Sequence, residues 1–334
     1  MSDVTPIFLL SLPRCGSTLT QRIMASHLQI ATTSEPWILL PQLYSLRAEG
    51  VYAEYWHRAT VRGIEDFCEE LPGKRADYLR VQRDAAQRLY TLARDRLAER
   101  DECAPDARYF LDKSIRYHFV VDELFELYPD AKFVFLWRNP LAQIASTLEA
   151  WSQGNWNLFL FRADLYEGLA NLIDASTKFA DRSITVRYED LTGDPESTWP
   201  VVFEHLGLTW DSSQLENFAR VDLRGRLGDS VGMRSYDKLE RAPLDKWKAT
   251  LANPLRKQWC RRYLRWIGRD RLATMGYDLD ALQEELRSIR SGGRHLLGDA
   301  WRRPMSVPFV WLELETLKDK LRAARARRIV VPHR

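Results

Sequence analysis

Short apolar runs typical of buried strands alternate with helical patterns along most of this chain. An order of strand, helix, strand, helix predicts a three-layer α/β fold, in which helices cover both faces of a central parallel sheet. Ligands of such folds bind at the carboxyl ends of the strands. The expected strands are residues 7–11, 109–112, 132–137 and 183–187. The expected helices are residues 17–27, 81–100, 115–128, 141–151, 157–180 and 199–206.

The first strand-turn-helix junction has the composition of an anion-binding site. Residues 12–19 read Leu-Pro-Arg-Cys-Gly-Ser-Thr-Leu, so that a tight turn holds an arginine, a glycine and two hydroxyl groups. The turn directs backbone N–H groups and the positive end of the helix dipole at one point, where Arg14, Ser17 and Thr18 add side-chain donors. A phosphate or a sulfate fits this environment. A plain turn in which Ser17 caps the helix is the structural alternative.

Two common phosphate-binding loops do not match this segment. The loop of nucleoside triphosphatases requires G-x-x-x-x-G-K-[ST], and both the first glycine and the lysine are missing here. Cysteine phosphatases place an arginine six positions after the cysteine, whereas Arg22 follows Cys15 by seven. Residues 12–19 instead resemble the loop that binds the 5′-phosphosulfate of PAPS (3′-phosphoadenosine 5′-phosphosulfate) in sulfotransferases. The resemblance implies that the phosphosulfate is bound by Arg14, Cys15, Gly16, Ser17, Thr18 and Leu19.

A second strand-turn-helix junction carries another cation. The apolar run 131–137 is followed by Arg138, Asn139 and Pro140, and Pro140 suits the first position of a helix that contains Ser146. In the sulfotransferase family an arginine at the end of such a strand and a serine eight residues later bind the 3′-phosphate of PAPS, and Arg138 and Ser146 have that spacing. A planar guanidinium suits this role because it can hold phosphate oxygens bidentately. Two anion sites imply a ligand with phosphates at both ends of its ribose.

Two later segments add to the resemblance. Residues 184–191, Ile-Thr-Val-Arg-Tyr-Glu-Asp-Leu, resemble the family's strand that ends near the adenine, which implies that Tyr188 contacts the base by stacking or through its hydroxyl. Residues 235–241 and the following Asp-Lys-Trp resemble the protein-tyrosine sulfotransferases. That likeness implies that Ser235 lies near the cofactor phosphates, and it leaves Lys246 and Lys248 as alternatives for a nearby cation.

The catalytic base depends on which branch of the family the chain follows. Cytosolic small-molecule sulfotransferases place a histidine two residues after a strand-end lysine; Lys113 is present here, but Ile115 occupies the histidine position. Protein-tyrosine sulfotransferases and several bacterial relatives use a glutamate shortly after the first helix, and this position corresponds to Glu35. The resemblance therefore implies that Lys113 contacts the sulfonate and that Glu35 is the base. His118 is a second candidate, and an acid at a helix N-terminus is the structural alternative for Glu35.

Length, charge and cysteine content agree with a compact enzyme. The chain has 334 residues, 45% of them hydrophobic, and a net charge of +3, which does not suggest nucleic-acid binding. Four cysteines without paired spacing support neither a zinc site nor a disulfide framework. We expect a sulfotransferase domain over residues 1–280 and a basic helical extension over 281–334 that packs, contacts an oligomer partner or binds acceptor. Without a signal peptide or an apolar span in the sequence, we expect a cytoplasmic location.

The predicted function is in-line transfer of a sulfuryl group from PAPS to an alcohol or phenol, with PAP as product and no metal ion required. The acceptor class is left open among small molecules, carbohydrates and peptides. The fold implied is the sulfotransferase type, which is related to the P-loop nucleotide kinases. Two alternatives remain: a nucleotide-kinase-like phosphotransferase, which would need a P-loop lysine and Mg²⁺, and a non-catalytic nucleotide-binding module, in which Glu35 and Lys113 would be dispensable.

Overall fold

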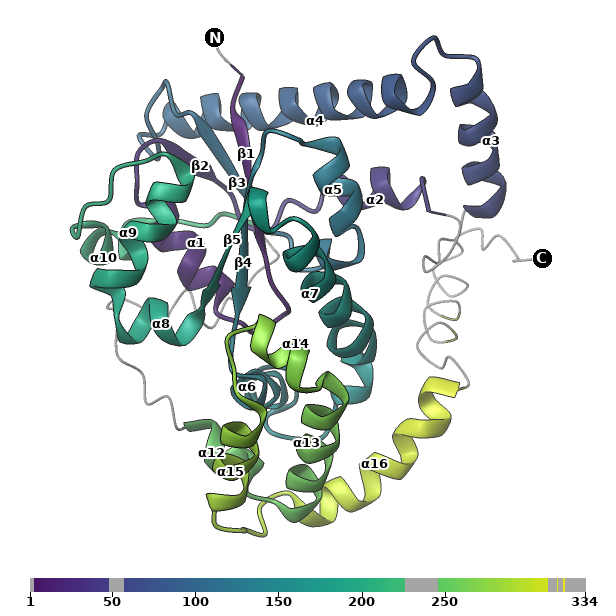
Figure 1. The fold of residues 1–334 in the computed structure, drawn as a ribbon, viewed down its shortest axis with the longest axis vertical. Coiled ribbons are helices and arrows are strands. Elements are labelled where there is room, and N and C mark those ends of the chain that lie inside the picture. Colours follow the sequence, from purple (N-terminus) through teal and green to yellow (C-terminus); the bar gives the residue numbers. More distant parts are fainter. Residues whose placement is uncertain (1–2, 48–56, 226–245, 312–316, 318–320, 322–334) are drawn as a thin grey trace.

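The computed structural model describes residues 3–47, 57–225, 246–311, 317 and 321 (Figure 1). Within these residues the chain forms a five-stranded sheet in the order β2-β3-β1-β4-β5, and every neighbouring pair is parallel. The strands are β1 (Thr5–Leu10), β2 (Ile30–Thr32), β3 (Tyr109–Asp112), β4 (Lys132–Trp137) and β5 (Ser183–Arg187). The central strand β1 pairs on both sides, with Ile7 opposite Leu111 of β3 and Lys132 of β4.

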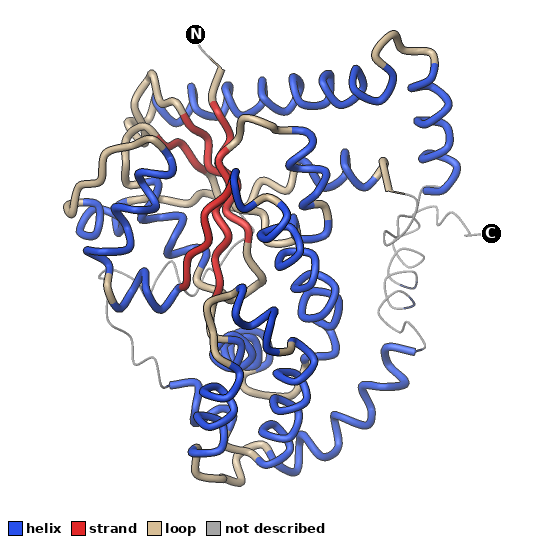
Figure 2. Tube along the Cα trace, in the orientation of Figure 1, coloured by secondary structure: helices blue, strands red, loops and turns tan. Residues whose placement is uncertain are grey.

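Helices cover both faces of this sheet, which confirms the predicted fold class (Figures 1 and 2). One face carries α1 (Ser17–Ala25), α8 (Tyr188–Gly193), α9 (Pro195–Leu206) and α10 (Gln214–Asn217). The other carries α2 (Leu39–Tyr44), α5 (Val121–Leu127) and α7 (Leu169–Lys178). Helix α4 (Lys74–Ala98) extends across one end of the sheet, and α3 (His57–Glu69) lies at its outer end, away from the sheet.

The remaining helices lie beyond the carboxyl ends of the strands, in the lower half of Figure 1. They are α6 (Pro140–Ser152), α12 (Lys246–Leu251), α13 (Pro254–Ile267), α14 (Arg269–Thr274), α15 (Leu279–Ser288) and α16 (Leu296–Trp311). Short 3-10 turns are η1 (Tyr117–Phe119), η2 (Leu158–Phe161), η4 (Ala180–Arg182) and η5 (Phe218–Arg220), and η3 (Asp164–Gly168) is a π-helix.

Three helical predictions need correction. The helix expected at 115–128 is divided into η1 and α5, and the one expected at 157–180 is a succession of η2, η3 and α7. The helix expected from 81 begins earlier, at Lys74. A periodic apolar pattern identifies such segments as helical but does not distinguish a 3-10 or π turn from an α turn, because the periods are close.

The apolar core is continuous from the sheet to the helices after residue 246. Phe8 of β1 stacks on Phe133 of β4 at 5.4 Å between ring centroids, and Phe125 of α5 stacks on Phe133 at 3.6 Å. Leu282 and Leu286 of α15 belong to the same cluster. The expected boundary between a domain over residues 1–280 and an extension over 281–334 falls within α15. That division stays a prediction.

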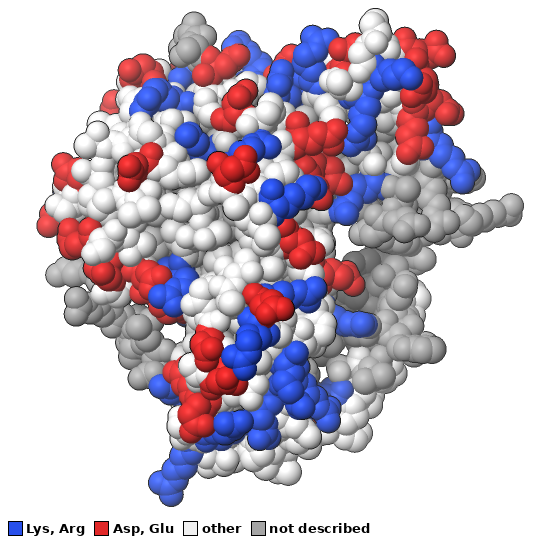
Figure 3. Space-filling view, viewed as in Figure 1, with Lys and Arg blue, Asp and Glu red and all other residues white. Residues whose placement is uncertain are grey.

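On the face shown in Figure 3, charge is mixed rather than gathered into one basic patch. Lysine and arginine are interspersed with aspartate and glutamate over most of this face, and the positive side chains are denser toward the bottom, over α13. In the part of the chain that the structure describes, no helix combines the length and the apolarity needed to cross a lipid bilayer.

Candidate active site

The predicted site residues follow the carboxyl ends of all the strands in the described sheet. Because the strands are parallel, these ends share one edge, which is where ligands of α/β sheets bind. In their order across the sheet, the residues that follow β2, β3, β1, β4 and β5 are Glu35, Lys113, Arg14, Arg138 and Tyr188. Residues far apart in sequence are thus brought to one edge.

The loop after β1 needs a glycine at position 16 for two independent reasons. Gly16 has φ 89°, a left-handed conformation that glycine adopts without strain. A Cβ atom at this position would also lie 2.2 Å from Cδ2 of Tyr188. Gly16 is the N-cap of α1 and the helix begins at Ser17, so the alternative of a capping Ser17 is wrong. The side chains of Ser17, Thr18 and Leu19 are buried in the first turn of that helix.

The two arginines and the serine predicted to bind phosphate lie together. Arg14 Nε donates a hydrogen bond to Ser146 Oγ at 3.3 Å, and Arg138 Nη1 donates to the Arg14 carbonyl oxygen at 2.8 Å. The Arg138 guanidinium lies 4.8 Å from the centroid of the Tyr188 ring, close enough for a cation–π contact. Its Nε is buried and has no hydrogen-bond partner among the described residues. The loop after β1, the loop after β4 and α6 therefore form one cationic cluster.

A carboxylate that the sequence interpretation did not single out fixes this cluster in place. Glu189, beside Tyr188, accepts one hydrogen bond from the Asn139 backbone N–H at 3.0 Å and one from the Tyr277 hydroxyl at 2.6 Å. Asn139 in turn caps α6 by accepting from the Leu141 N–H at 2.9 Å, with Pro140 at the first helical position as predicted. The Asn-Pro pair signals the cap in the sequence, whereas nothing local signals Tyr277.

Glu35 and Lys113 form a buried ion pair. Lys113 Nζ lies 2.7 Å from Glu35 Oε1, and the two side chains are only 2% and 6% exposed. The second carboxylate oxygen, Oε2, accepts from the Trp37 indole N–H at 3.0 Å. The Trp37 backbone N–H donates to Ser114 Oγ at 3.0 Å, which joins the segment after β2 to the turn after β3. A cation and a carboxylate are thus held side by side at the edge of the sheet.

Beneath this pair, Asp112 gathers three hydroxyl groups. Its carboxylate accepts from Ser114 Oγ at 2.7 Å, from the Tyr117 hydroxyl at 2.8 Å and from the Tyr90 hydroxyl at 2.6 Å. Burial raises the pKa of Asp112, and these hydrogen bonds and Lys113 oppose the shift. The network holds the turn that carries Lys113. An acidic residue closing a buried strand is the sequence signal that could have identified it.

His118, the second candidate for the base, points to a carboxylate on η3. Its Nε2 lies 2.9 Å from Asp164 Oδ1, and Arg116 Nη2 lies 3.3 Å from Asp164 Oδ2. The histidine and the aspartate are almost completely buried. Burial lowers the pKa of His118, and the hydrogen bond to Asp164 opposes that shift. The ring is therefore part of a packed polar cluster between η1 and η3.

The cysteine-phosphatase alternative has no support in the geometry. Burial raises the pKa of the Cys15 thiol to about 12, so a thiolate nucleophile is not available there. Arg22 is buried and donates from Nη2 to the Ala219 carbonyl at 2.8 Å. Both side chains are buried.

Three further predictions concern the region after residue 225. Ser235 lies outside the described residues, as does the side chain of Lys246. Lys248 lies on α12, where its Nζ is 3.2 Å from Glu285 Oε1 of α15. That contact joins two helices after residue 246.

Comparison with curated proteins finds two relatives, each matched over part of its length. The nodulation protein NoeE of Sinorhizobium fredii is 34% identical over 155 residues, which cover 45% of this chain and 33% of that protein. An uncharacterized protein of Aquifex aeolicus is 26% identical over 227 residues, which cover 64% of this chain and 27% of that protein. The chain thus spans a third or less of these relatives.

Solved structures with a partial likeness include three sulfotransferases. The sulfotransferase domain of the Synechococcus PCC 7002 olefin synthase has a TM-score of 0.48 and 23% identity, covering 75% of this chain and 89% of that one. The sulfotransferase domain from the curacin biosynthetic pathway has a TM-score of 0.46 and 19% identity, covering 86% and 98%. Mouse sulfotransferase SULT7A1, solved with PAP, has a TM-score of 0.45 and 13% identity, covering 86% and 90%.

A family model makes the decisive comparison, because it spans all the strand ends described above. It carries the description "Sulfotransferase family" and matches residues 6–212. This chain belongs to the sulfotransferase family.

Proposed function

We propose that this chain transfers a sulfuryl group from PAPS to the hydroxyl group of an alcohol or phenol. The observation that carries the proposal is the contact set that joins Arg14, Ser146 and Arg138, at 3.3 and 2.8 Å, on the same sheet edge as the Glu35–Lys113 pair. A donor with separate phosphate groups needs cations at two strand-helix junctions. An acyl or glycosyl donor without phosphates would not.

The residues at this edge fit the donor chemically. The buried Nε of Arg138 has no hydrogen-bond partner in the described chain, and a buried donor of this kind calls for an acceptor such as a phosphate oxygen. Gly16 leaves the loop without a side chain where a Cβ would collide with Tyr188. The first N–H groups of α1 face the loop without intrahelical partners, as at any helix N-terminus.

Each group has a separate role in this proposal. Arg138 and Ser146 hold the 3′-phosphate, residues 14–19 hold the phosphosulfate, and Tyr188 contacts the adenine. When bound, PAPS supplies the sulfuryl group and leaves as PAP. Mouse SULT7A1, solved with PAP, illustrates this ligand in a protein of partial likeness.

Glu35 and Lys113 divide the chemistry between a base and a cation. An ammonium group has three N–H donors, so Lys113 can keep its contact with Glu35 while it donates to a sulfonate oxygen. A carboxylate oxygen has a second lone pair after accepting one hydrogen bond, so Glu35 can also accept the proton of the acceptor hydroxyl. The Trp37 indole holds the carboxylate in a fixed orientation for that transfer.

A thermal-shift screen with PAP, ATP with Mg²⁺, and GTP tests the donor site. PAP should stabilise the protein without metal, by about 2.7 kcal/mol at 100 times its Kd. Adenosine 5′-phosphosulfate, which lacks the 3′-phosphate, should bind more weakly than PAPS; equal binding would contradict the role of Arg138 and Ser146. Stabilisation by ATP with Mg²⁺ but not by PAP would favour a phosphotransferase.

Activity is then tested with labelled PAPS and a panel of phenols, sugars and tyrosine peptides. Label should appear on an acceptor with wild-type protein and not with the Glu35→Gln variant. A protein that binds PAP but transfers label to no acceptor, and whose affinity for PAP is the same in the Glu35 and Lys113 variants, would be a non-catalytic nucleotide-binding module.

A further inference from the structure

A cavity lies beside α13 and is lined by residues other than those assigned to the donor. It has a volume of about 750 Å³ and opens between η2 and η3 on one side and α13 and α16 on the other. Its aromatic lining is Trp156, Phe159, Tyr166, Trp259 and Trp266. None of its described lining residues is among those assigned to PAPS, to the base or to the sulfonate. The volume falls in the range typical of small-molecule sites.

The aromatic side of the cavity is a continuous set of contacting rings. Trp156 meets Trp259 edge-on at 5.6 Å between centroids, and Trp259 stacks on Tyr263 at 5.1 Å. Tyr263 stacks on Trp266 at 5.9 Å, and Trp266 meets Tyr166 at 4.6 Å. Tyr263 backs this wall and is anchored by its hydroxyl, which donates to the Leu165 carbonyl at 2.9 Å. Rings packed against one another in this way give a flat ligand a surface to stack on, and aromatic side chains lose little conformational entropy on binding.

Charged groups at the cavity leave an excess of positive charge. Arg162, Arg303 and Glu167 line it, and no ion pair within the described residues joins Glu167 to either arginine. The Arg303 guanidinium lies 5.0 Å from the Trp156 centroid, at the aromatic wall. The pKa of Arg303 is lowered, mainly by burial and to a smaller extent by the positive charge of nearby Arg262. An anionic ligand group would offset both effects.

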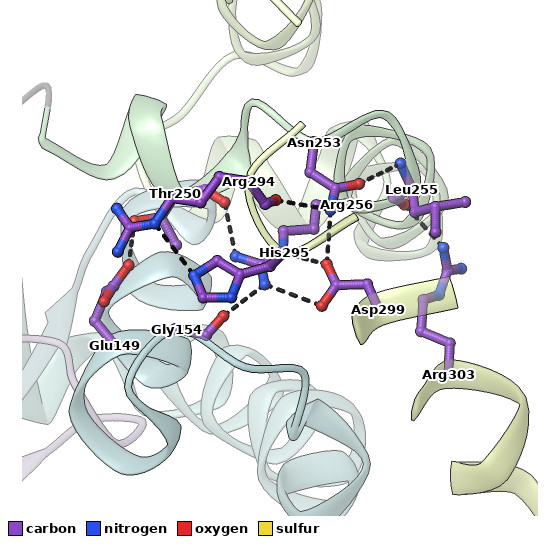
Figure 4. Close-up of polar contacts among 10 residues, drawn as sticks. All are labelled: Glu149, Gly154, Thr250, Asn253, Leu255, Arg256, Arg294, His295, Asp299 and Arg303. Carbon is purple, nitrogen blue, oxygen red and sulfur yellow. Dashed lines mark hydrogen bonds and ion pairs between the residues drawn. The ribbon is translucent and has the colours of Figure 1, made fainter. Parts of the chain in front are cut away.

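A buried ion pair fixes Arg303 over the cavity. One turn earlier on α16, Asp299 accepts two hydrogen bonds from Arg256 of α13, at 2.6 and 3.0 Å, and both side chains are 1% exposed (Figure 4). Asn253 donates a further bond to Asp299 at 2.9 Å, and Arg256 also donates to the Gly154 carbonyl. Arg303 Nη1 then donates to the Leu255 carbonyl at 3.0 Å. The position of α16 relative to α13 is therefore specified at this point.

We propose that this cavity binds a planar aromatic molecule that carries a sulfonate, sulfate, carboxylate or phosphate group. The rings take the flat part of the ligand, and Arg303 with Arg162 takes the anion. The site does not depend on the proposed sulfuryl transfer, because no residue is shared between the two.

Two fluorescent probes with related ring systems separate the aromatic from the anionic contribution. These are 1-anilinonaphthalene-8-sulfonate and its neutral counterpart N-phenyl-1-naphthylamine, titrated into the folded chain of 334 residues. The sulfonate probe should bind more tightly, and Arg303→Met should weaken it about tenfold, the size of one charge-assisted contact of about 1.4 kcal/mol. The neutral probe should change less than about twofold under the same substitution. Arg303→Lys, which retains the charge, should restore part of the lost affinity.

Matched substitutions on the same elements locate the probe. Trp266→Leu should weaken both probes, whereas Trp301→Leu and Arg302→Met, at exposed α16 positions outside the cavity lining, should weaken neither. Saturating PAP should leave the affinity of the sulfonate probe unchanged. Equal affinity for both probes, displacement by PAP, or equal effects of Arg302→Met and Arg303→Met would overturn the proposal.

Discussion

Replacing Glu35 by glutamine should destabilise the fold as well as stop sulfate transfer. The substitution leaves the Lys113 ammonium, whose side chain is 2% exposed, without the carboxylate that lies 2.7 Å away. Removing one partner of a buried ion pair costs about 3–5 kcal/mol, because the other charge stays buried and unpaired. That is a large part of a typical unfolding free energy of about 5–15 kcal/mol. Lys113→Met should destabilise for the same reason, and the double variant should be more stable than either single one.

A double-mutant cycle measured by urea unfolding tests this ordering. The matched control is the Lys74–Glu69 pair, which has the same 2.7 Å separation but side chains 64% and 65% exposed. Solvent screens that pair, so its two single substitutions should have small effects that add. If the Glu35 and Lys113 effects also add within about 0.5 kcal/mol, the two groups are not coupled and the reasoning fails.

The same variants test the chemistry once their folded fractions are known. A positioned general base contributes about 10² to 10⁴ in rate, or roughly 3–5 kcal/mol. Glu35→Gln should lose transfer by that factor per folded molecule, while His118→Ala should retain much of its turnover. Near-normal transfer by Glu35→Gln with a large loss in His118→Ala would return this chain to the histidine-base branch.

Three other perturbations have outcomes that the contacts specify. Arg138→Ala should weaken PAP binding roughly 10- to 150-fold in calorimetry, because one charge-assisted contact is lost; unaltered affinity would move the 3′-phosphate site elsewhere. Gly16→Ala should destabilise the protein and abolish PAP binding, since its Cβ would overlap Tyr188 and its φ is 89°. Gly193→Ala, at a site with nothing within 4 Å, is the control, and equal effects would contradict the close approach. Because burial lowers the pKa of His118, the unfolded chain binds a proton that the folded chain does not, and Tm should fall as the pH drops below about 6.5. In His118→Phe this decline should be smaller, and an identical pH profile would exclude the effect.

Four of the five strands in the described sheet were predictable, because they are short and mostly apolar runs bounded by polar residues. The runs 109–112, 132–137 and 183–187 match β3, β4 and β5, and β1 differs only at its ends. The strand β2 was missed, since Ile30–Thr32 is too short to show a period. It is a strand because β3 pairs with it, which is a tertiary effect.

For the candidate site too, some residues could be identified from the sequence and others could not. Motif resemblance selected residues at every strand end, and their roles toward a ligand stay predictions. The contacts that support the site could not be predicted from the sequence. Asp112 accepts a hydrogen bond from Tyr90, and Glu189 accepts one from Tyr277, and both pairs are far apart in the chain. Such partners are chosen by the packing of helices and strands, and a local pattern does not encode the choice. Of the basic helical extension expected over 281–334, the part after residue 311 falls mostly outside the described residues.

The place of β1 at the centre of the sheet has a consequence for synthesis on the ribosome. Its two neighbours, β3 and β4, begin at Tyr109 and Lys132, about 100 residues later in the chain. At about 5–20 residues per second, this strand waits on the order of 5–20 s for a partner on either side. During that time it is an unpaired apolar edge, open to pairing with another nascent chain. A chaperone that shields β1 during this time should therefore raise the yield of folded protein. The gain should be larger when translation is slower, because β1 then stays unpaired for longer.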